Sequence, residues 1–148
     1  EKLIAGLLPL AGMQAKAFDA TMAVDIEPSL PGVLADQVQI EQLLLNLIRN
    51  GFEAMRQSNG PRQLSLRAGL ESNEQVRVEV SDRGCGLPEN MLKGTWEPFC
   101  SSKEEGLGMG LSICRSIIEN HSGRFWAQPG PDGGTTFCFT LSTQSPSP

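Results

Sequence analysis

The sequence lacks several features that would place it in a common class of protein. No apolar run approaches the ~20 residues that a membrane-spanning helix requires, and basic residues are in the minority, with 12 Lys and Arg against 17 Asp and Glu. The formal net charge of −5 argues against a general nucleic-acid-binding surface, which would need a basic patch. We therefore expect no nucleic-acid partner and no membrane contact. A nucleotide held by backbone amides and a metal ion remains compatible with this charge.

The sequence also lacks a C-x-x-C pair, and it has a single histidine, His121. Its four cysteines are Cys85, Cys100, Cys114 and Cys138. This spacing disfavours both a zinc site and a secreted disulfide framework, so we expect reduced thiols in a cytoplasmic protein. The chain opens at Glu1 with neither an initiator methionine nor a signal segment, which we interpret as a fragment of a longer protein.

The remaining composition is that of one globular domain. The chain has 148 residues, of which 39% are apolar and 20% charged. Periodicity predicts helices over 3–18, 37–57 and 108–121, and strands over 22–27, 63–70, 75–82, 124–128 and 135–142. Because adjacent strand segments suggest hairpins, we expect an α/β two-layer sandwich, a mixed sheet with helices on one face. Residues 1–142 would form the domain and 143–148 a flexible tail.

The predicted helix over 37–57 carries a polar stripe of Asn46, Asn50 and Glu53 at positions i, i+4 and i+7. Asparagine is a poor helix former, as is the neighbouring Gly51, and local rules are often broken at functional sites. An asparagine oxygen is a neutral hard ligand that suits Mg²⁺ already balanced by phosphates. An ordinary solvated helix face is the alternative interpretation.

Asp82 ends an alternating strand and is followed by Gly84 and Gly86. A carboxylate at a strand end can accept a hydrogen bond from an exocyclic amine such as that of adenine. The two glycines would let the backbone pass close to a flat ring. A plain Asp-x-Gly turn is the alternative.

Gly106, Gly108 and Gly110 run directly into a predicted amphipathic helix, where exposed amides favour phosphate binding. The spacing matches neither a P-loop nor a Rossmann turn, and a flexible linker is the alternative. Lys103 precedes these glycines and is either a mobile phosphate-binding cation or a solvated lysine. His121 ends the helix, where a histidine often only faces the negative end of the dipole.

The order of these motifs is more specific than any one of them. NLIRNGFEAM, DRGCGLP, EPFCSSK, GLGMGLSICRSIIENHSGRF and GGTTFCFTL span residues 46–141. They resemble, in order, the N box, first glycine box, F box, second glycine box and terminal glycine-threonine element of the GHKL (Bergerat-fold) ATPases. Within that superfamily the chain most resembles the catalytic ATP-binding domain of bacterial sensor histidine kinases, in particular their nitrogen- and oxygen-sensing subgroup.

The resemblance implies a mixed sheet backed by about three helices, with a mobile ATP lid over 95–107. It implies Asn50 as the Mg²⁺ ligand, Asn46 as its polar neighbour, and Asp82 as the partner of the adenine amine. Many histidine kinases have a lysine at the position of Glu53, so this chain departs from their pattern here. The implied catalytic residues are Asn46, Asn50 and Lys103. The implied ATP-binding residues are Asn50, Glu53, Asp82, Gly84, Gly86, Phe99, Lys103, Gly106, Leu107, Gly108, Met109, Gly110, Leu111 and Thr135.

The implied reaction is transfer of the γ-phosphate of Mg·ATP to a histidine. No block of this chain resembles the family's phosphoacceptor motif, so the acceptor would lie on a separate dimerisation domain, with a response regulator downstream. One rival hypothesis is an ATP-driven conformational clamp, but such members usually carry a water-activating Glu where this chain has Asn46. Two further hypotheses are a serine-directed anti-sigma kinase and a non-catalytic nucleotide sensor.

Overall fold

The structure, a computed structural model, describes residues 2–56, 60–72, 74–84, 107–131 and 133–143. Its elements in chain order are α1 (Lys2–Ala17), β1 (Thr21–Ile26), α2 (Gln37–Ala54), β2 (Gln63–Ser72), β3 (Gln75–Ser81), α4 (Leu107–Asn120), β4 (Phe125–Pro129) and β5 (Thr135–Ser142). Each of them coincides with a predicted helix or strand to within a few residues. The predicted lid over 95–107 lies outside the described residues except for Leu107, where α4 begins.

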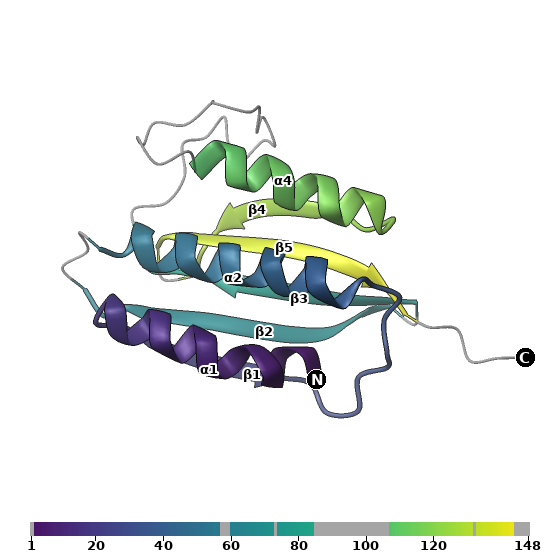
Figure 1. The fold of residues 1–148 in the computed structure, drawn as a ribbon, viewed down its shortest axis with the longest axis horizontal. Helices are drawn as coiled ribbons and strands as arrows, with labels where there is room; N and C mark the ends of the chain where they lie inside the picture. The colour runs from purple at the N-terminus through teal and green to yellow at the C-terminus, as the bar shows by residue number, and fades with distance from the viewer. Residues whose placement is uncertain (1, 57–59, 73, 85–106, 132, 144–148) are drawn as a thin grey trace, which may run out of the picture.

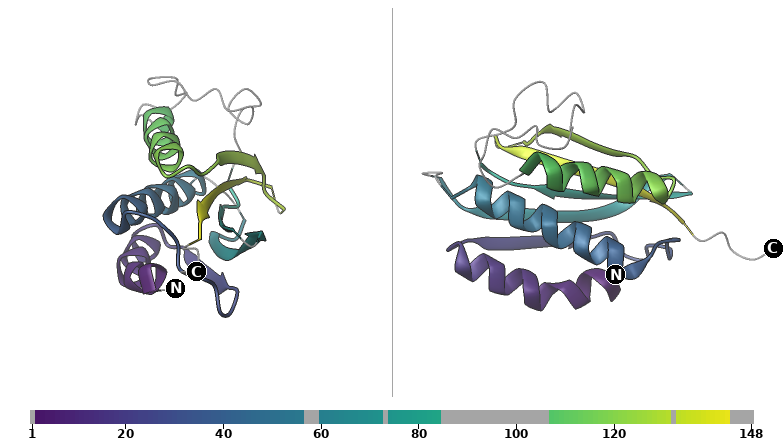
Figure 2. Two further views of the ribbon diagram at one scale, coloured as in Figure 1. Left: turned by 90° about the vertical axis from the view of Figure 1, so that its right-hand side faces the viewer. Right: turned by 45° about the horizontal axis from the view of Figure 1, so that its top comes forward.

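The five strands form one mixed sheet in the order β1-β2-β3-β5-β4. β1 is parallel to β2, and the other neighbours are antiparallel. A parallel pair needs a crossover connection, and α2 supplies it between β1 and β2. Figures 1 and 2 show α1, α2 and α4 on one face of the sheet. The predicted two-layer α/β sandwich is therefore confirmed for the described residues.

Helix α2 is the centre of the helical layer. Its first residues follow Asp36, whose carboxylate caps the helix by accepting a hydrogen bond from the Gln39 amide at 3.1 Å. Its apolar residues recur at helical spacing and are buried, namely Ile40, Leu43, Leu44, Leu47, Ile48 and Phe52. They face alternate residues of the strands, which include Leu64, Leu66, Val76, Val78, Val80, Phe137 and Phe139. This packing fixes one face of α2 on the sheet and leaves another toward α4.

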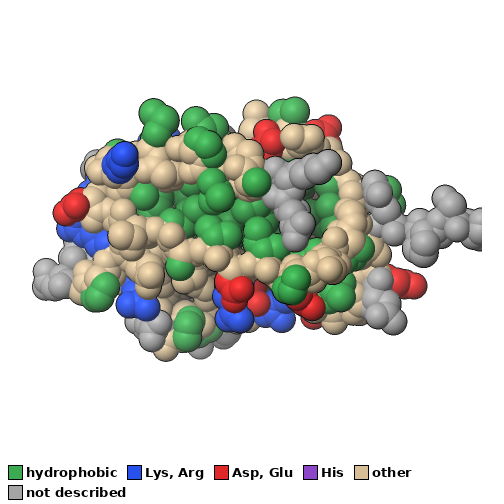
Figure 3. Space-filling model, turned by 90° about the horizontal axis from the view of Figure 1, so that it is seen from below, with side chains coloured by type: hydrophobic (Ala, Val, Ile, Leu, Met, Phe, Trp, Pro, Cys, Tyr) green, Lys and Arg blue, Asp and Glu red, His purple; other side chains and the backbone are tan. Residues whose placement is uncertain are grey.

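The edge of the domain formed by α1 and β1 exposes apolar side chains. Seen from below, hydrophobic side chains gather in the hollow between α1 and β1 (Figure 3). Leu10 and Met13 of α1 and Val24 of β1 are exposed. β1 ends the sheet here, because β2 is its only neighbour among the described strands.

The C-terminal boundary differs by one residue from the predicted one. Thr143, which we expected in the flexible tail, is buried, and its amide donates to the Glu74 carbonyl at 2.8 Å. It also forms an isolated bridge with Val33. Backbone pairing to two distant segments therefore holds Thr143 in the domain, and the rest of the predicted tail, 144–148, lies outside the described residues.

None of the described helices is long and apolar enough to cross a bilayer.

Candidate functional site

Asp82 lies directly after β3 and is only 4% exposed. One of its carboxylate oxygens, Oδ1, accepts hydrogen bonds from the Gly84 amide at 2.8 Å and the Thr135 amide at 3.2 Å. Its own amide donates to the Thr135 carbonyl at 2.9 Å. Backbone groups from both sides therefore fix the orientation of this carboxylate.

Two glycines near Asp82 occupy positions where a larger residue would collide with its neighbours. A Cβ added at Gly134 would collide with the backbone and the carboxylate of Asp82. Gly134 also has a positive φ of 70°, which favours glycine. A Cβ added at Gly84 would collide with the Ala54 carbonyl at the end of α2. Gly84, predicted to let the chain pass a flat ring, is thus also required by its contact with α2.

The polar stripe of α2 is partly buried, not fully solvated. The Asn46 amide nitrogen, Nδ2, donates to the Cys114 thiol at 3.4 Å. The Nδ2 atom of Asn50 is buried and has no hydrogen-bond partner among the described residues. Glu53 instead forms an i, i+4 ion pair with Arg49 at 3.1 Å. Two amides and one paired carboxylate therefore occupy one side of this helix.

Thr135 is 3% exposed, and it contacts Asp82 through its backbone amide. Its place among the ATP-binding residues remains a prediction. Helix α4 begins at Leu107, so Gly108 and Gly110 lie in its first turn, where amides lack intrahelical acceptors. Leu111, also predicted at the nucleotide, is fully buried.

The remaining predicted residues are not placed by the structure. Gly86, Phe99, Lys103 and Gly106 lie outside the described residues, and only the backbone of Met109 is described. Their roles remain predictions.

His121 has the structural role that its position at the helix end predicts. Its Nδ1 donates to the Ile117 carbonyl at 2.7 Å, and its Nε2 accepts from the Asp36 amide at 3.0 Å. With both ring nitrogens engaged, the imidazole joins the end of α4 to the N-cap of α2. These bonds hold both ring nitrogens of His121 within the fold, whereas a phosphate acceptor would need an accessible nitrogen.

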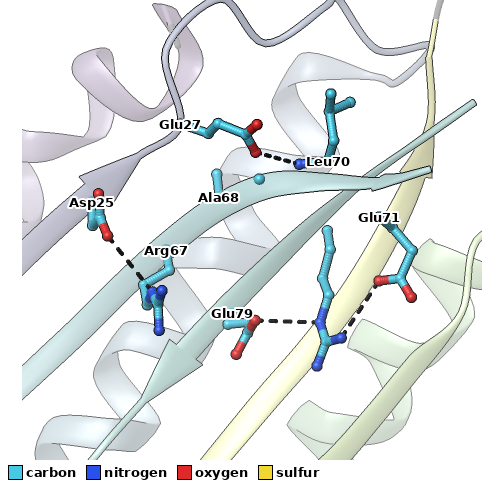
Figure 4. Close-up of a pocket in the computed structure, with 9 residues that line it drawn as sticks. Asp25, Glu27, Arg67, Ala68, Leu70, Glu71 and Glu79 are labelled. Atoms are coloured by element: carbon cyan, nitrogen blue, oxygen red, sulfur yellow. Dashed lines mark hydrogen bonds and ion pairs between the residues drawn. The ribbon is translucent and has the colours of Figure 1, made fainter. Parts of the chain in front are cut away.

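The opposite face of the sheet carries a groove of about 540 Å³ (Figure 4). Its carboxylates are engaged by neighbours within the fold: Asp25 pairs with Arg67 at 3.8 Å, and Glu27 accepts from the Leu70 amide at 2.8 Å. Arg77 lies between Glu79, at 3.3 Å, and Glu71, at 3.6 Å. The carboxylates of the groove are therefore paired with arginines or with a backbone amide of the same domain. No group of three or more His, Cys, Asp or Glu in the described part of the chain could hold a metal ion.

Residues 35–145 match the family model described as "Histidine kinase-, DNA gyrase B-, and HSP90-like ATPase". The chain belongs to this ATPase family. The predicted resemblance is therefore confirmed, and the surroundings of Asp82 and Asn50 lie in a nucleotide-binding ATPase domain.

The relatives of this ATPase domain are sensor proteins. The chain is 44% identical to the sensor protein FixL of Bradyrhizobium diazoefficiens over 137 residues, which are 93% of this chain and 26% of FixL. It is 43% identical to the C4-dicarboxylate transport sensor protein DctS of Rhodobacter capsulatus over 143 residues, 95% of this chain and 21% of DctS. The chain thus spans about a quarter of the length of these curated relatives.

A solved structure shows the same fold. The catalytic domain of the histidine kinase ThkA superposes with a TM-score of 0.80 at 28% identity, covering 96% of this chain and 92% of that domain. The ATPase domain described here therefore corresponds in extent to a histidine kinase catalytic domain.

Sequence reasoning missed two contributors to the site. Cys114 looks like an ordinary apolar position of an amphipathic helix, and nothing in its spacing indicates a contact with Asn46. Gly134 lies in a turn between two strands, and its contact with Asp82 joins segments that are far apart in the sequence. Only the three-dimensional arrangement shows either contact.

Proposed function

We propose that this ATPase domain binds Mg·ATP and transfers the γ-phosphate to a histidine on a separate dimerisation domain of its parent sensor kinase. The observation that carries the proposal is the buried Asp82 carboxylate, oriented by the amides of Gly84 and Thr135. Its relatives FixL and DctS are sensor proteins, and the ThkA domain is the catalytic domain of a histidine kinase.

The base would be recognised by Asp82. A carboxylate accepts hydrogen bonds and cannot donate them when ionised, so it suits the exocyclic amine of adenine and repels the carbonyl that guanine carries at the same ring position. We therefore expect adenine nucleotides to be preferred over guanine nucleotides.

The residues present fit a magnesium ion. A buried amide nitrogen without a partner costs about 1–3 kcal/mol, and such exceptions need an explanation. The Nδ2 of Asn50 is such an atom among the described residues. Its amide oxygen is a neutral hard ligand that would suit Mg²⁺ alongside phosphates. When bound, the ion would offset the charge of the phosphates.

Positioning would supply most of the catalysis. The amides of Gly108 and Gly110, in the first turn of α4, would hold the phosphates at the positive end of the helix dipole. Lys103 would add a cation. Asn46 cannot act as a base toward water, which favours transfer to a protein nucleophile over hydrolysis.

The acceptor histidine would come from another domain. Both ring nitrogens of His121 are engaged within the fold, one with Ile117 and one with Asp36. In-line attack requires the acceptor nitrogen within roughly 3–3.5 Å of the γ-phosphorus, so His121 would have to leave these bonds. We place the reaction in the cytoplasm, with a response regulator receiving the phosphoryl group.

The test uses ATP labelled in its γ-phosphate. The chain alone, and the same chain with His121→Gln, should acquire no acid-labile label. Addition of a histidine-containing dimerisation domain from a related sensor kinase should give label on that domain, and Asp82→Asn should reduce that label at sub-saturating ATP. Acid-labile label on the chain that disappears with His121→Gln would overturn the proposal. Nucleotide binding without any transfer to histidine domains would favour the non-catalytic sensor.

A further inference from the structure

Cys114 lies where helices α2 and α4 meet. Its sulfur accepts the 3.4 Å hydrogen bond from Nδ2 of Asn46, and the residue is only 1% exposed. On α4 it falls between Leu111 and Ile118, both fully buried, so it is the polarisable member of an otherwise aliphatic stripe. A buried sulfur thus meets a polar residue of the α2 stripe.

The thiol is suited to act as a neutral acceptor. Burial raises the pKa of Cys114 to about 11, and the bond from Asn46 counters only part of that rise. The side chain therefore stays protonated at neutral pH and introduces no charge beside the phosphates. A weak, neutral acceptor can orient an amide without competing for a cation.

Asn46 lies one helical turn before Asn50 on the same side of α2. The nitrogen and oxygen of a side-chain amide are fixed relative to each other, so anchoring the nitrogen on Cys114 also sets the direction of the oxygen. Cys114 is on the helix whose first turn contains Gly108 and Gly110. The contact therefore couples the amide stripe of α2 to the glycine-rich start of α4.

We propose that Cys114 is a positioning residue, whose thiol holds the Asn46 amide in the orientation that the phosphate and metal side of the nucleotide site requires. The inference rests on the proposed function. It assigns Cys114 no contact with the nucleotide and no chemistry of its own.

Cys138 provides a matched control. It is also a free, fully buried cysteine whose pKa burial raises to about 11. Its side chain contacts Arg77 at 3.9 Å, on the face of the sheet away from the helices. Substitution of either cysteine by alanine removes the same atoms from a buried place, but only Cys114 contacts Asn46.

The experiment measures ADP affinity by calorimetric titration, with Mg²⁺ and with EDTA, together with the thermal midpoint of each variant. Cys114→Ala should weaken Mg·ADP binding about three- to tenfold, the scale of one hydrogen bond, with less than a twofold change in EDTA. Cys114→Ser keeps an acceptor and should restore Mg·ADP affinity to within about twofold. Cys138→Ala should lower the thermal midpoint without changing either affinity.

Equal behaviour of Cys114→Ala and Cys138→Ala would overturn the inference and leave Cys114 as packing only. Failure of Cys114→Ser to restore affinity, while its thermal midpoint is that of the wild type, would also overturn it.

A second measurement does not depend on nucleotide. The side-chain NH₂ resonances of Asn46 in a ¹⁵N-correlation spectrum should shift in Cys114→Ala and not in Cys138→Ala. If Asp82→Asn leaves nucleotide binding unchanged, the proposed function fails on its own. If Asp82→Asn weakens binding but Cys114→Ala leaves both the resonances and the affinities unchanged, only the present inference fails.

Discussion

The carboxylate of Asp82 is oriented by two backbone amides at the same end of the antiparallel β3–β5 pair. Because the Gly84 and Thr135 amides both reach Oδ1, an amide side chain in its place could keep these two bonds through its own oxygen. The other end of the side chain would then change from acceptor to donor. A single substitution can thus separate ligand recognition from folding.

We therefore predict that Asp82→Asn weakens binding of adenine nucleotides by ~1–3 kcal/mol, the scale of losing a charged hydrogen-bond partner. The thermal midpoint should fall little, because the backbone contacts are kept. Calorimetric titration with ATP measures the effect, and Glu79→Gln, which removes an acid of β3 on the opposite face, should leave the affinity unchanged. Equal affinity of the wild type for ATP and GTP would contradict the adenine assignment.

The turn between β4 and β5 contains two glycines whose substitutions can be compared directly. Gly133 and Gly134 both have positive φ, of 81° and 70°, but a Cβ at Gly133 meets nothing within 4 Å. We predict that Gly133→Ala costs only the backbone strain, about 1–2 kcal/mol. Gly134→Ala should cost more and should also weaken nucleotide binding, because its methyl group would displace Asp82. Urea denaturation and ATP titration of the two variants check this, and identical affinities would contradict it.

At the scale of elements, α2 carries both a large share of the core and the proposed metal ligand. Its apolar face packs on the sheet, and Asn50 projects from the remaining side with a buried, unpartnered Nδ2 among the described residues. Removing that amide should affect the site more than the fold, because its Nδ2 donates no hydrogen bond within the part of the chain that the structure describes.

We predict that Asn50→Ala reduces nucleotide affinity in Mg²⁺ by about tenfold or more, the scale of one strong ligand interaction, with a much smaller change in EDTA. Asn120→Ala, at the exposed end of α4, is the control. Titration of ADP under both conditions measures the difference. An equal loss in Mg²⁺ and EDTA would mean that Asn50 is not the metal ligand.

The elements themselves were predictable because each depends on local patterns. The 3.6-residue spacing of apolar residues marks α2, alternation marks β3, and Asp36 marks the start of a helix. The order of the strands in the sheet was harder to predict, since β3 pairs with β5 across a long stretch of chain that includes α4. The same limit applies to the site: the residue types around Asp82 were predicted, but the backbone bond from Thr135 joins two distant segments.

The two buried thiols affect the stability of the whole molecule. Burial raises the pKa of Cys114 and of Cys138 from 9.0 to about 11. The folded state therefore keeps these protons in a range where the unfolded state loses them. Below about pH 9 both states bind the protons and the full stability is present, whereas it falls as the pH rises from about 9 to 11.

We predict a decrease in the free energy of unfolding of up to about 1.4 kcal/mol per pH unit for each thiol in this range. Urea denaturation between pH 8 and about pH 10.5 measures the slope. The double variant Cys114→Ala/Cys138→Ala should be less stable at pH 8 but should show a flatter dependence. The same slope in both proteins would mean that other groups cause the decrease.

The position of β1 at the open edge has a consequence for the order in which the domain assembles. β2–β3 and β4–β5 are hairpins closed by short turns, whereas β1 reaches β2 only after α2 has crossed the sheet. Closing that long segment costs more chain entropy, so β1 should join late. The helix beside it, α1, contains Pro9, which removes one helical hydrogen bond.

We expect α1 and β1 to open together at a free energy below that of global unfolding. The Ala23 and Asp25 amides should then exchange hydrogen before those of Phe137 and Phe139. A common exchange free energy for all four would show a single cooperative unit. With partial opening at this edge, the N-terminal part could loosen while the strands that position Asp82 stay paired.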